Sequence, residues 1–359
     1  MDYEKLQKYL GTKDMSAVEA MQKIDINSKG ILYIADEKGK LLGSLTDGDI
    51  RRWLIKTANL NSRASDMMFR DVHFLFKDDH KKAGNFMKKW EINSVPIVDS
   101  DHRVVDIVIR AEDAAAEGEK DHALKGTPII IMAGGKGTRL YPYTKILPKP
   151  LIPIGDVPIL ERIFQAFYEY GADEFYLTVN YRKEMIRSYF SEQNLPYTLR
   201  YVEEDQPLGT AGSIRYINEQ FQEPVIVTNC DTLIEADYAK MAEHHKSSGN
   251  GMTIISSLKN TVIPYGVIHS REDGIISSIK EKPKLSYFIN TGMYIVNPEC
   301  LLEIPKGKFF HMTDLASRLM EQGVQVGMYP ISENSFLDMG EFEEMKKMEA
   351  RINIRAEKK

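Results

Sequence analysis

Residues 129–153 read IIIMAGGKGTRLYPYTKILPKPLIP, and this stretch sets the architecture of most of the chain. The apolar run Ile129–Met132 predicts a fully buried strand of a parallel sheet, because both faces of such a strand are covered. The turn that follows contains Gly134, Gly135 and Gly137. Glycine lets the backbone take left-handed conformations and lets a ligand approach closely. The N–H groups of such a turn form a concavity suited to phosphate oxygens.

Two cations follow the glycine loop, Arg139 and Lys149. Ligands of an open α/β sheet bind at the carboxyl ends of its strands. A glycine loop with two cations at such an end predicts a nucleotide phosphate site. The alternative is a tight strand–helix turn whose Arg and Lys side chains are merely solvated.

Two well-known phosphate loops do not fit this stretch. A Walker A loop requires Gly at position 130 and Ser or Thr after Gly-Lys, but Ile130 and Gly137 occupy those positions. A dinucleotide fingerprint requires Gly or Ala three residues after Gly137, where the chain has Leu140. What remains is G-G-x-G-T-R-L followed by L-P-K-P-L-I-P at 147–153.

This pair of segments resembles the signature of the sugar-nucleotide pyrophosphorylases, which transfer a nucleotidyl group to a sugar 1-phosphate. The resemblance implies an α/β fold with a Rossmann-like, mainly parallel sheet, a GT-A-like nucleotidyltransferase domain. It also implies Mg²⁺ as cofactor and a catalytic role for Arg139 and Lys149. The loop residues that it assigns to nucleotide binding are Ala133, Gly134, Gly135, Gly137 and Thr138.

Length and composition are those of an ordinary globular protein with two or three domains. The chain has 359 residues, 43% hydrophobic and 28% charged, with a net charge of −5. Nothing in this balance favours binding to nucleic acid or to an anionic membrane. The sequence shows no signal-peptide core and no run of membrane-spanning length. Its two cysteines, Cys230 and Cys300, have no metal-ligand or disulfide pattern, so we expect a cytoplasmic protein.

Residues 1–120 contain an internal repeat. LYIADEKGKLLG at 32–43 matches VPIVDSDHRVVD at 95–106 at a constant offset. Each copy predicts a helix, a strand, an acidic turn, a second strand and then a helix beginning near Asp49 or Glu112. This order resembles a tandem pair of CBS motifs, the nucleotide-sensing module of many enzymes, at about 1–60 and 61–120.

The first copy carries the ribose-binding T-x-x-D pattern of that module as Thr46 and Asp49. The resemblance implies a regulatory adenine or guanine nucleotide there. The second copy has Ile109 and Glu112 at those positions, and Ile has no hydrogen-bonding side chain. We therefore expect at most one complete nucleotide site. The alternative is that Asp49 only caps the following helix.

After a linker at 121–127, strands and helices alternate through 128–359, as in an α/β domain. In the family that it resembles, the segment that includes Gln206, Gly209 and Thr210 recognises the base. Glycine would allow close backbone approach, and Gln206 could offer its amide to the base edge. The alternative is an ordinary helix start capped by Thr210.

Asp231 follows a second buried strand, Pro224–Asn229, at the strand end where ligands bind. It matches the family's metal-binding aspartate, although Cys230 replaces the usual Gly before it. The alternative is that Asp231 caps a following helix. Asp338 stands where relatives have a second acid, so the resemblance implies that Asp231 and Asp338 hold Mg²⁺.

The sugar-binding half resembles the family in three short motifs, Y-G, E-K-P and N-T-G. A lysine beside a carboxylate on a proline-flanked loop could hold a sugar phosphate while the acid takes hydroxyls. An exposed charge pair is the alternative. The implied sugar-phosphate residues are Gly266, Glu281, Lys282, Asn290 and Thr291.

The resemblance implies that an NTP and a sugar 1-phosphate give an NDP-sugar and pyrophosphate. The glycine-loop form and the CBS fusion look most like bacterial guanylyltransferases of surface-glycan pathways, which favours GTP over CTP, UTP or dTTP. The sugar would be of the hexose, glucosamine or heptose type. We expect a homodimer or homotetramer. A catalytically silent, nucleotide-sensing regulatory subunit is the competing hypothesis.

Overall fold

The computed structural model describes residues 6–27, 29–110, 122–217 and 220–356. It divides into two compact units, which we describe separately. The first consists of residues 1–117 and 258–288, and the second of residues 118–257 and 289–359. No helix among the described residues is long and apolar enough to cross a membrane.

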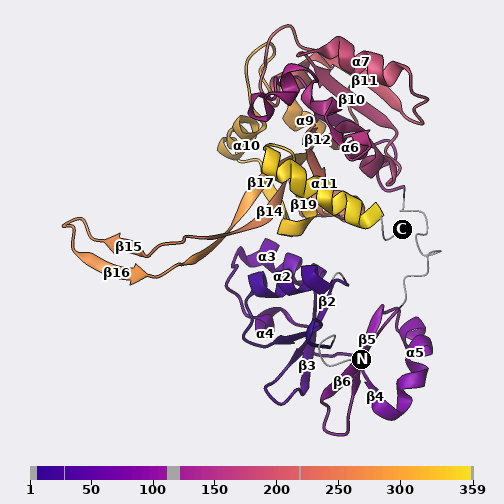
Figure 1. Cartoon of the computed structure of the whole chain (residues 1–359), viewed down its shortest axis with the longest axis vertical. Coiled ribbons are helices and arrows are strands. Elements are labelled where there is room, and N and C mark those ends of the chain that lie inside the picture. The colour runs from indigo at the N-terminus through magenta and orange to yellow at the C-terminus, as the bar shows by residue number, and fades with distance from the viewer. Residues whose placement is uncertain (1–5, 28, 111–121, 218–219, 357–359) are drawn as a thin grey trace. The chain divides into compact units, whose positions relative to one another are not determined.

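The first unit contains the predicted repeat as two three-stranded sheets with the same internal order (Figure 1). In each sheet the first two strands pair in parallel and the last two antiparallel. The antiparallel pairs shift register at equivalent places, after Ile34 and after Ile97. The strands are β1 (Leu10–Thr12), β2 (Ile31–Ala35) and β3 (Leu41–Thr46), then β4 (Leu75–Phe76), β5 (Ser94–Val98) and β6 (Val104–Ile109).

Helices accompany both sheets of the repeat. They are α2 (Ala17–Asn27), α3 (Asp47–Thr57), α4 (Ala64–Met67) and α5 (Ala83–Lys89), the last preceded by a 3₁₀ turn at Lys77–Lys82. Helix α3 begins at Asp47 with Thr46 as its N-cap, slightly earlier than expected. The helix expected near Glu112, like residues 111–121 of the linker region, lies outside the described residues.

The hairpin of the first unit is formed by β15 (Val267–Ser270) and β16 (Ile276–Lys280). The two strands pair antiparallel around a turn at Arg271–Ile275. The sequence does not predict this hairpin, because its exposed strands show no buried face.

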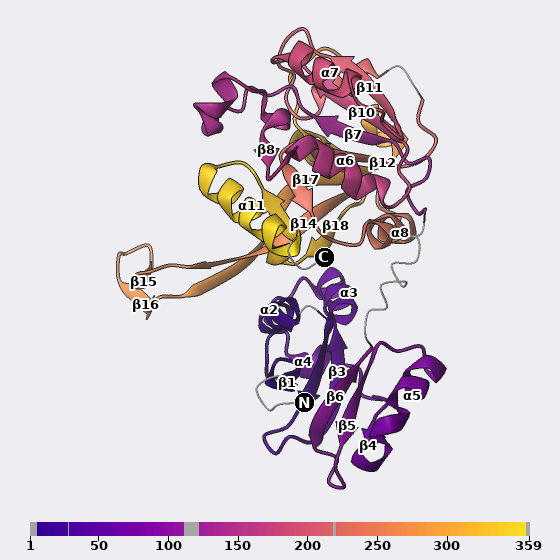
Figure 2. The same cartoon turned by 45° about the vertical axis from the view of Figure 1, so that its right-hand side comes forward.

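A seven-stranded sheet in the order β11-β10-β7-β12-β17-β14-β18 forms the second unit (Figure 2). Its first four strands run parallel, and β17 joins β12 antiparallel, so the sheet is mixed but mainly parallel, as predicted. The strands are β7 (Ile129–Met132), β10 (Glu174–Val179), β11 (Thr198–Glu203), β12 (Val225–Asn229), β14 (Met252–Val262), β17 (Lys284–Val296) and β18 (Val326–Ile331).

Helices cover both faces of this sheet, which explains why β7 is apolar at every position. Ile129 and Ile131 belong to one apolar cluster, while Ile130 and Met132 belong to another. Alternate residues of a strand point to opposite faces, so a strand between two cores needs a continuous apolar run. The first cluster includes side chains of α6 (Ile159–Tyr168), α7 (Lys183–Ser191), α8 (Tyr238–Ser248) and α11 (Phe342–Ala356), and the second those of α9 (Pro298–Leu301) and α10 (Met312–Glu321).

Two small antiparallel sheets complete the second unit. They pair β8 (Pro153–Ile154) with β9 (Val157–Pro158), and β13 (Thr232–Ile234) with β19 (Phe336–Asp338). Short 3₁₀ turns occupy Thr138–Leu140, Tyr143–Lys145, Lys149–Leu151, Gly212–Tyr216 and Glu333–Ser335. The pairing of β13 with β19 joins chain segments about a hundred residues apart, and it positions the acids described below.

Candidate active site

The glycine loop leaves β7 at its carboxyl end. Gly137 has a φ of 63°, in the left-handed region, and a Cβ there would meet Thr144 at 3.0 Å and Lys149 at 3.2 Å. Glycine is therefore required to bring the loop against Lys149. The backbone N–H groups of residues 134–137 have no hydrogen-bond acceptor among the described residues. These free donors make the loop a ready anion site.

A cavity of about 380 Å³ lies over this loop at the carboxyl ends of the parallel strands. Nine of the residues predicted from sequence line it: Gly134, Gly135, Gly137, Thr138, Arg139, Lys149, Gly209, Thr210 and Asp231. The remaining lining residues are Met132, Thr178, Glu204, Pro207, Leu208, Asn229, Cys230 and Phe309. Segments far apart in sequence therefore converge on one cavity.

Lys149 and Asp231 form an ion pair at this cavity. Lys149 is buried, at 7% exposure, and Asp231 is largely covered. Because β13 pairs with β19, Thr232 lies opposite Asp338, and Met339 N–H donates to Asp231 C=O at 2.9 Å. The two predicted metal ligands are thus brought to the same place by the small sheet.

The surroundings of Asp338 change the pKa of its carboxyl group. Burial raises the pKa of Asp338 above its ordinary value, and the charge of Asp231 raises it further. Lys149 and Arg139 act in the opposite direction. Two neighbouring carboxylates that repel each other gain stability from a cation placed between them.

The donor set fits a magnesium ion held jointly with substrate. No group of three or more His, Cys, Asp or Glu side chains suited to a metal occurs in the described part of the chain. Mg²⁺ commonly takes one or two protein carboxylates and completes its shell with water and substrate phosphate oxygens. Asp231 and Asp338 supply that number.

Arg139 is exposed and lines the cavity. Its guanidinium has no hydrogen-bond or ion-pair partner among the described residues. An unpaired guanidinium beside free backbone N–H groups matches the several oxygens of a polyphosphate. The positive charge predicted for this end of the sheet is therefore available to a ligand.

Glu204 lines the cavity and was not identified from sequence. It follows β11 and is buried, at 6% exposure, with its carboxyl oxygens packed against Gly134. Burial raises the pKa of Glu204, while Ser213, the Leu208 N–H, which donates to it at 3.4 Å, and Thr178 lower the pKa. A second acid directly after Glu203 carries no motif, so only the fold shows that it faces the cavity.

Not all of the residues predicted to bind the nucleotide line the cavity. Thr210 Oγ1 accepts from Met312 N–H at 3.1 Å and so supports the start of α10. The turn that follows is 3₁₀, with Ala211 rather than Thr210 at its N-cap, so the helix-cap alternative for Thr210 is wrong. Ala133 and Gln206 are not among the residues that line the cavity. The Ala133 N–H donates to Thr178 C=O at 3.1 Å, and the Gln206 side chain is exposed.

The helix-cap alternative for Asp231 is also wrong. Asp231 is followed by β13, not by a helix, and α8 begins later with Asp237 as its cap. Cys230, in the position of the usual Gly, is buried in the apolar core beneath the cavity. Burial raises the pKa of the Cys230 thiol to about 12, which keeps it neutral and unsuited to act as a nucleophile.

The predicted sugar-phosphate residues fall in both units. Gly266, Glu281 and Lys282 belong to the exposed hairpin of the first unit, and Lys282 has a φ of 42°. Asn290 and Thr291 lie on β17 in the second unit. Asn290 Nδ2 donates to Tyr294 Oη at 2.7 Å, and Thr291 Oγ1 donates to Ile255 C=O at 2.7 Å. These two side chains therefore hold neighbouring strands together.

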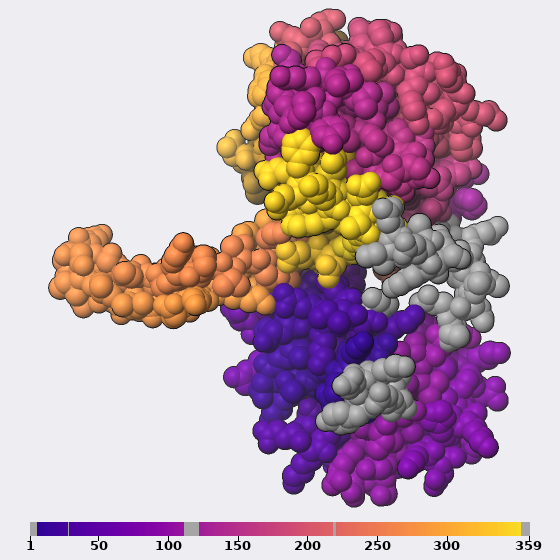
Figure 3. Space-filling model, in the orientation of Figure 1, coloured from indigo at the N-terminus to yellow at the C-terminus, as the bar shows by residue number. Residues whose placement is uncertain are grey.

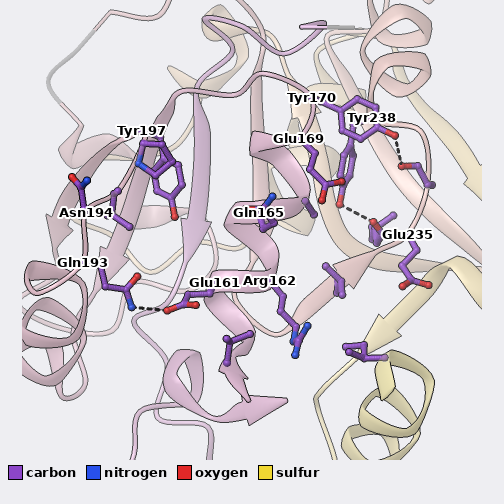
Figure 4. Close-up of a pocket in the computed structure, with 18 residues that line it drawn as sticks. Glu161, Arg162, Gln165, Glu169, Tyr170, Gln193, Asn194, Tyr197, Glu235 and Tyr238 are labelled. Carbon is purple, nitrogen blue, oxygen red and sulfur yellow. Dashed lines mark hydrogen bonds between the residues drawn. The ribbon is translucent and has the colours of Figure 1, made fainter. Parts of the chain in front are cut away.

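A second, larger cavity of about 920 Å³ lies along α6 and the loop before β11 (Figure 4). Gln193 donates to Glu161 at 2.6 Å on one side of it. Its lining includes the carboxylates of Glu161, Glu169 and Glu235, with Arg162 as the cation. An excess of carboxylates repels phosphate, so the smaller cavity is the better nucleotide site despite its size.

At the predicted ribose site of the first repeat, Thr46 and Asp49 contact each other. Thr46 N–H and Oγ1–H donate to Asp49 Oδ2 at 2.9 and 2.6 Å, and Asp49 N–H donates to Thr46 Oγ1 at 3.2 Å. The arrangement is a capping box at the start of α3. Asp49 Oδ1 accepts from Arg52, whose side chain is 73% exposed.

A mainly parallel α/β sheet with a glycine loop, two cations and two acids at its strand ends defines a nucleotide-phosphate-binding protein. The family model described as nucleotidyl transferase matches residues 129–353, and the chain belongs to this family. A CBS domain model matches residues 12–56. This match covers the first copy of the repeat. The strands of the second copy pair in the same way as those of the first.

Known relatives support the same family. The chain is 34% identical over 181 residues to a mannose-1-phosphate guanyltransferase of Debaryomyces hansenii, covering 48% of this chain and 50% of that protein. It is 34% identical over 215 residues to a UTP–glucose-1-phosphate uridylyltransferase of Synechocystis, covering 54% and 55%. The chain thus spans about half the length of the curated relatives that it matches. The crystal structure of HddC from Yersinia pseudotuberculosis is 27% identical, with a TM-score of 0.50, and the match covers 63% of this chain and 99% of that one.

Proposed function

We propose that the chain transfers a guanylyl group from GTP to a sugar 1-phosphate of the hexose, glucosamine or heptose type, giving a GDP-sugar and pyrophosphate. The observation that carries this proposal is the cluster of Lys149, Asp231 and Asp338 beside the free N–H groups of the glycine loop. Both reactants are anions, so catalysis requires positioning and charge neutralisation rather than acid–base chemistry.

In the proposed reaction an oxygen of the sugar phosphate forms a bond to the α-phosphorus of GTP. The bond from that phosphorus to the oxygen bridging to the β-phosphate breaks, and pyrophosphate leaves with the electron pair. Arg139 and the glycine loop hold the β- and γ-phosphates. Lys149 neutralises charge at the reacting centre. No nucleophilic side chain takes part.

Asp231 and Asp338 would hold Mg²⁺, which supplies charge neutralisation at the α-phosphate. Lys149 pairs with Asp231. With Asp231 holding the cation, the Lys149 ammonium group would be available to phosphate oxygens. The buried ion pair therefore keeps two opposite charges compensated until substrate arrives.

Glu204 favours guanine among the four candidate bases. A buried carboxylate accepts hydrogen bonds and donates none when ionised. The Watson–Crick edge of guanine offers two adjacent donors, N1–H and N2–H. The edges of uracil and thymine offer a single donor between two carbonyl acceptors, and cytosine has one exocyclic donor beside acceptors. The relatives named above are a guanyltransferase in one case and a UTP-dependent uridylyltransferase in the other, so Glu204 adds independent support.

The test is to incubate the pure protein with each NTP, Mg²⁺ and a panel of sugar 1-phosphates and to measure pyrophosphate. We expect release with GTP to exceed that with UTP, dTTP or CTP. Release with another NTP would keep the reaction and overturn the base. No release with any pair would favour the competing hypothesis, a catalytically silent regulatory subunit, although the joint presence of Arg139, Lys149, Asp231 and Asp338 speaks against it.

We further propose that the CBS repeat binds an adenine or guanine nucleotide at Thr46 and Asp49, and that the protein acts in the cytoplasm as a homodimer or homotetramer. Both cysteines are free and buried, which fits a reducing compartment. The catalytic residues all follow residue 128, so the repeat would act on the rate by linkage rather than by supplying catalytic groups.

A further inference from the structure

The hairpin of the first unit exposes an unusual number of large apolar side chains. Tyr265 is 74% exposed, Ile279 61% and Ile268 59%, and every residue of β16 is exposed. We call residues 262–287 the arm. Figure 3 draws the arm in orange. Its exposed apolar residues are Val262, Tyr265, Ile268, Ile275, Ile276, Ile279, Leu285 and Tyr287. Exposed patches of this kind mark interaction surfaces.

The strand register gathers part of this apolar surface on one side of the ribbon. Ile268 lies directly opposite Ile279, and beyond a register shift between His269 and Ser270, Ser270 lies opposite Ile276. Ile268 and Ser270 are two apart in β15 and share a face, and a residue lies on the same face as its cross-strand partner, so the three isoleucines gather on one side of the ribbon. The sheet of β15 and β16 has two strands, so in the described structure neither outer edge is paired with another strand. Two-stranded ribbons are only marginally stable in water unless something covers them.

We propose that the arm is a dimerisation surface and that its partner is the arm of a second copy of the chain, lying antiparallel with the isoleucine face inward. Such an interface is isologous, because each copy contributes the same patch. It goes beyond the proposed reaction and does not depend on it.

The charges along the arm favour a second copy of the chain as the partner and an antiparallel arrangement of the two arms. The tip carries Arg271, Glu272 and Asp273, a net charge of −1. The base end of β16 and the residues beyond it carry Lys280, Glu281, Lys282 and Lys284, a net charge of +2, and Lys284 also donates to Gln22 at 3.1 Å. The three isoleucines are placed between these ends. An antiparallel pair sets the acidic tip of each arm beside the basic end of the other, whereas a parallel pair would set like charges together. Complementary charges of this kind fix register more than they raise affinity.

Strand geometry then predicts which positions meet across the two-fold axis. Ile268 is five residues from Asp273 at the tip, and about as far from the base, so it lies near the axis. At roughly 3.3 Å per residue, the two Asp273 side chains would be about 30 Å apart. The mid-arm positions of two copies would be neighbours, and the tips would not.

The first experiment measures the mass of the full-length protein by light scattering and sedimentation equilibrium. We expect Ile268→Glu/Ile279→Glu to halve the mass of the wild-type particle at micromolar concentration, with association at least tenfold weaker. Met320→Glu is the matched control, since Met320 is 57% exposed on α10, outside the arm, and it should leave the mass unchanged. A monomeric wild type, or an arm variant of unchanged mass, would overturn the proposal.

The second experiment tests direction. Under copper–phenanthroline oxidation Ile268→Cys should form a disulfide between copies, because a disulfide needs Cβ atoms within about 4.5 Å, whereas Asp273→Cys should not. The native Cys230 and Cys300 are buried and do not compete. Lys280→Glu/Lys284→Glu should weaken association, and adding Glu272→Lys/Asp273→Lys should restore it. Equal cross-linking at both positions, or no restoration, would refute the antiparallel arrangement.

Discussion

Asp231 and Asp338 are the residues on which the proposed metal assistance depends. We expect Asp231→Asn and Asp338→Asn each to lower kcat by roughly 100-fold or more, because loss of metal stabilisation at the transferring phosphate costs several kcal/mol. Steady-state pyrophosphate release measures this. Asp156→Asn is the control, since its side chain is 93% exposed. Near wild-type turnover of either variant at limiting Mg²⁺ would remove that residue from the metal site.

A second prediction concerns the stability of the metal-free protein, which depends on the charge of Asp338. Its folded-state pKa is raised, so the folded protein binds this proton more tightly than the unfolded chain, and stability falls as pH rises through the interval between the ordinary and the raised pKa. Above that interval Asp338→Asn removes a repelling charge and should raise the melting temperature. The gain should shrink as the pH is lowered, because the wild-type carboxyl then becomes neutral.

Thermal scans in chelator that start at pH 3.8, the ordinary pKa of an aspartate, and extend to neutral pH measure this difference. Adding Mg²⁺ with GTP should reverse its sign, since only the wild type then gains the bound cation. A melting-temperature difference that stays constant across the pH range would show that the Asp338 charge has no stability cost.

Glu204 is the residue expected to set base preference. Glu204→Gln exchanges a two-acceptor carboxylate for an amide with one acceptor and one donor group, which matches uracil better than guanine. We expect kcat/KM for GTP to fall roughly 10- to 100-fold, the cost of losing a hydrogen bond to a charged group, while kcat/KM for UTP changes little or rises. Glu203→Gln, on the exposed neighbour, is the control. Equal losses with both nucleotides would assign Glu204 a structural role.

Among the elements, the loop between β11 and the 3₁₀ turn at Gly212–Tyr216 tests how closely backbone segments must approach. Gly209 has a φ of 79°, and a Cβ there would lie 2.5 Å from Phe310 O. Gly209→Ala should therefore destabilise the second unit by roughly 1–3 kcal/mol and weaken nucleotide binding. Gly135→Ala is the control for stability, since no atom lies within 4 Å of its Cβ position. Denaturant unfolding of both variants makes the comparison.

Much of this element order could be predicted from the sequence. The sequence predicts the strand Ile129–Met132 at its observed place, because a continuous apolar run reports burial on both faces directly. The position of Asp231 at a strand end followed from the same pattern. Such predictions need only local sequence and a general rule about where parallel sheets bind ligands.

Other features depend on contacts between segments that are distant in the chain. Such contacts cannot be predicted from a single sequence. The nearness of Asp231 to Asp338 requires β13 to pair with β19. Glu204 faces the cavity only because Gly134 lies beneath it. The arm was missed because its alternating strands are too exposed to show a buried face, so Val267–Lys280 gave no strand pattern.

On the scale of the whole molecule, the proposed sensing role requires communication between the CBS repeat and the transferase domain. The repeat can influence the rate only if a nucleotide binds differently to two states of the protein. Asp49 is the residue through which this would occur. Its Oδ2 already accepts two hydrogen bonds from Thr46, which leaves Oδ1, paired with the exposed Arg52, for a ribose hydroxyl.

We therefore expect Asp49→Ala in the full-length protein to abolish any change of pyrophosphate release caused by AMP, ADP, ATP or GDP while the basal rate stays near wild type. The variant loses a capping box worth about 1 kcal/mol, so its folding must be checked by circular dichroism. Arg52→Ala is the matched control, because it frees Oδ1 and keeps the cap. It should preserve or tighten nucleotide binding in calorimetric titrations. If the wild type and Asp49→Ala bind these nucleotides with equal stoichiometry and affinity, Thr46 and Asp49 serve only to start α3, and the repeat has no sensing role at this position.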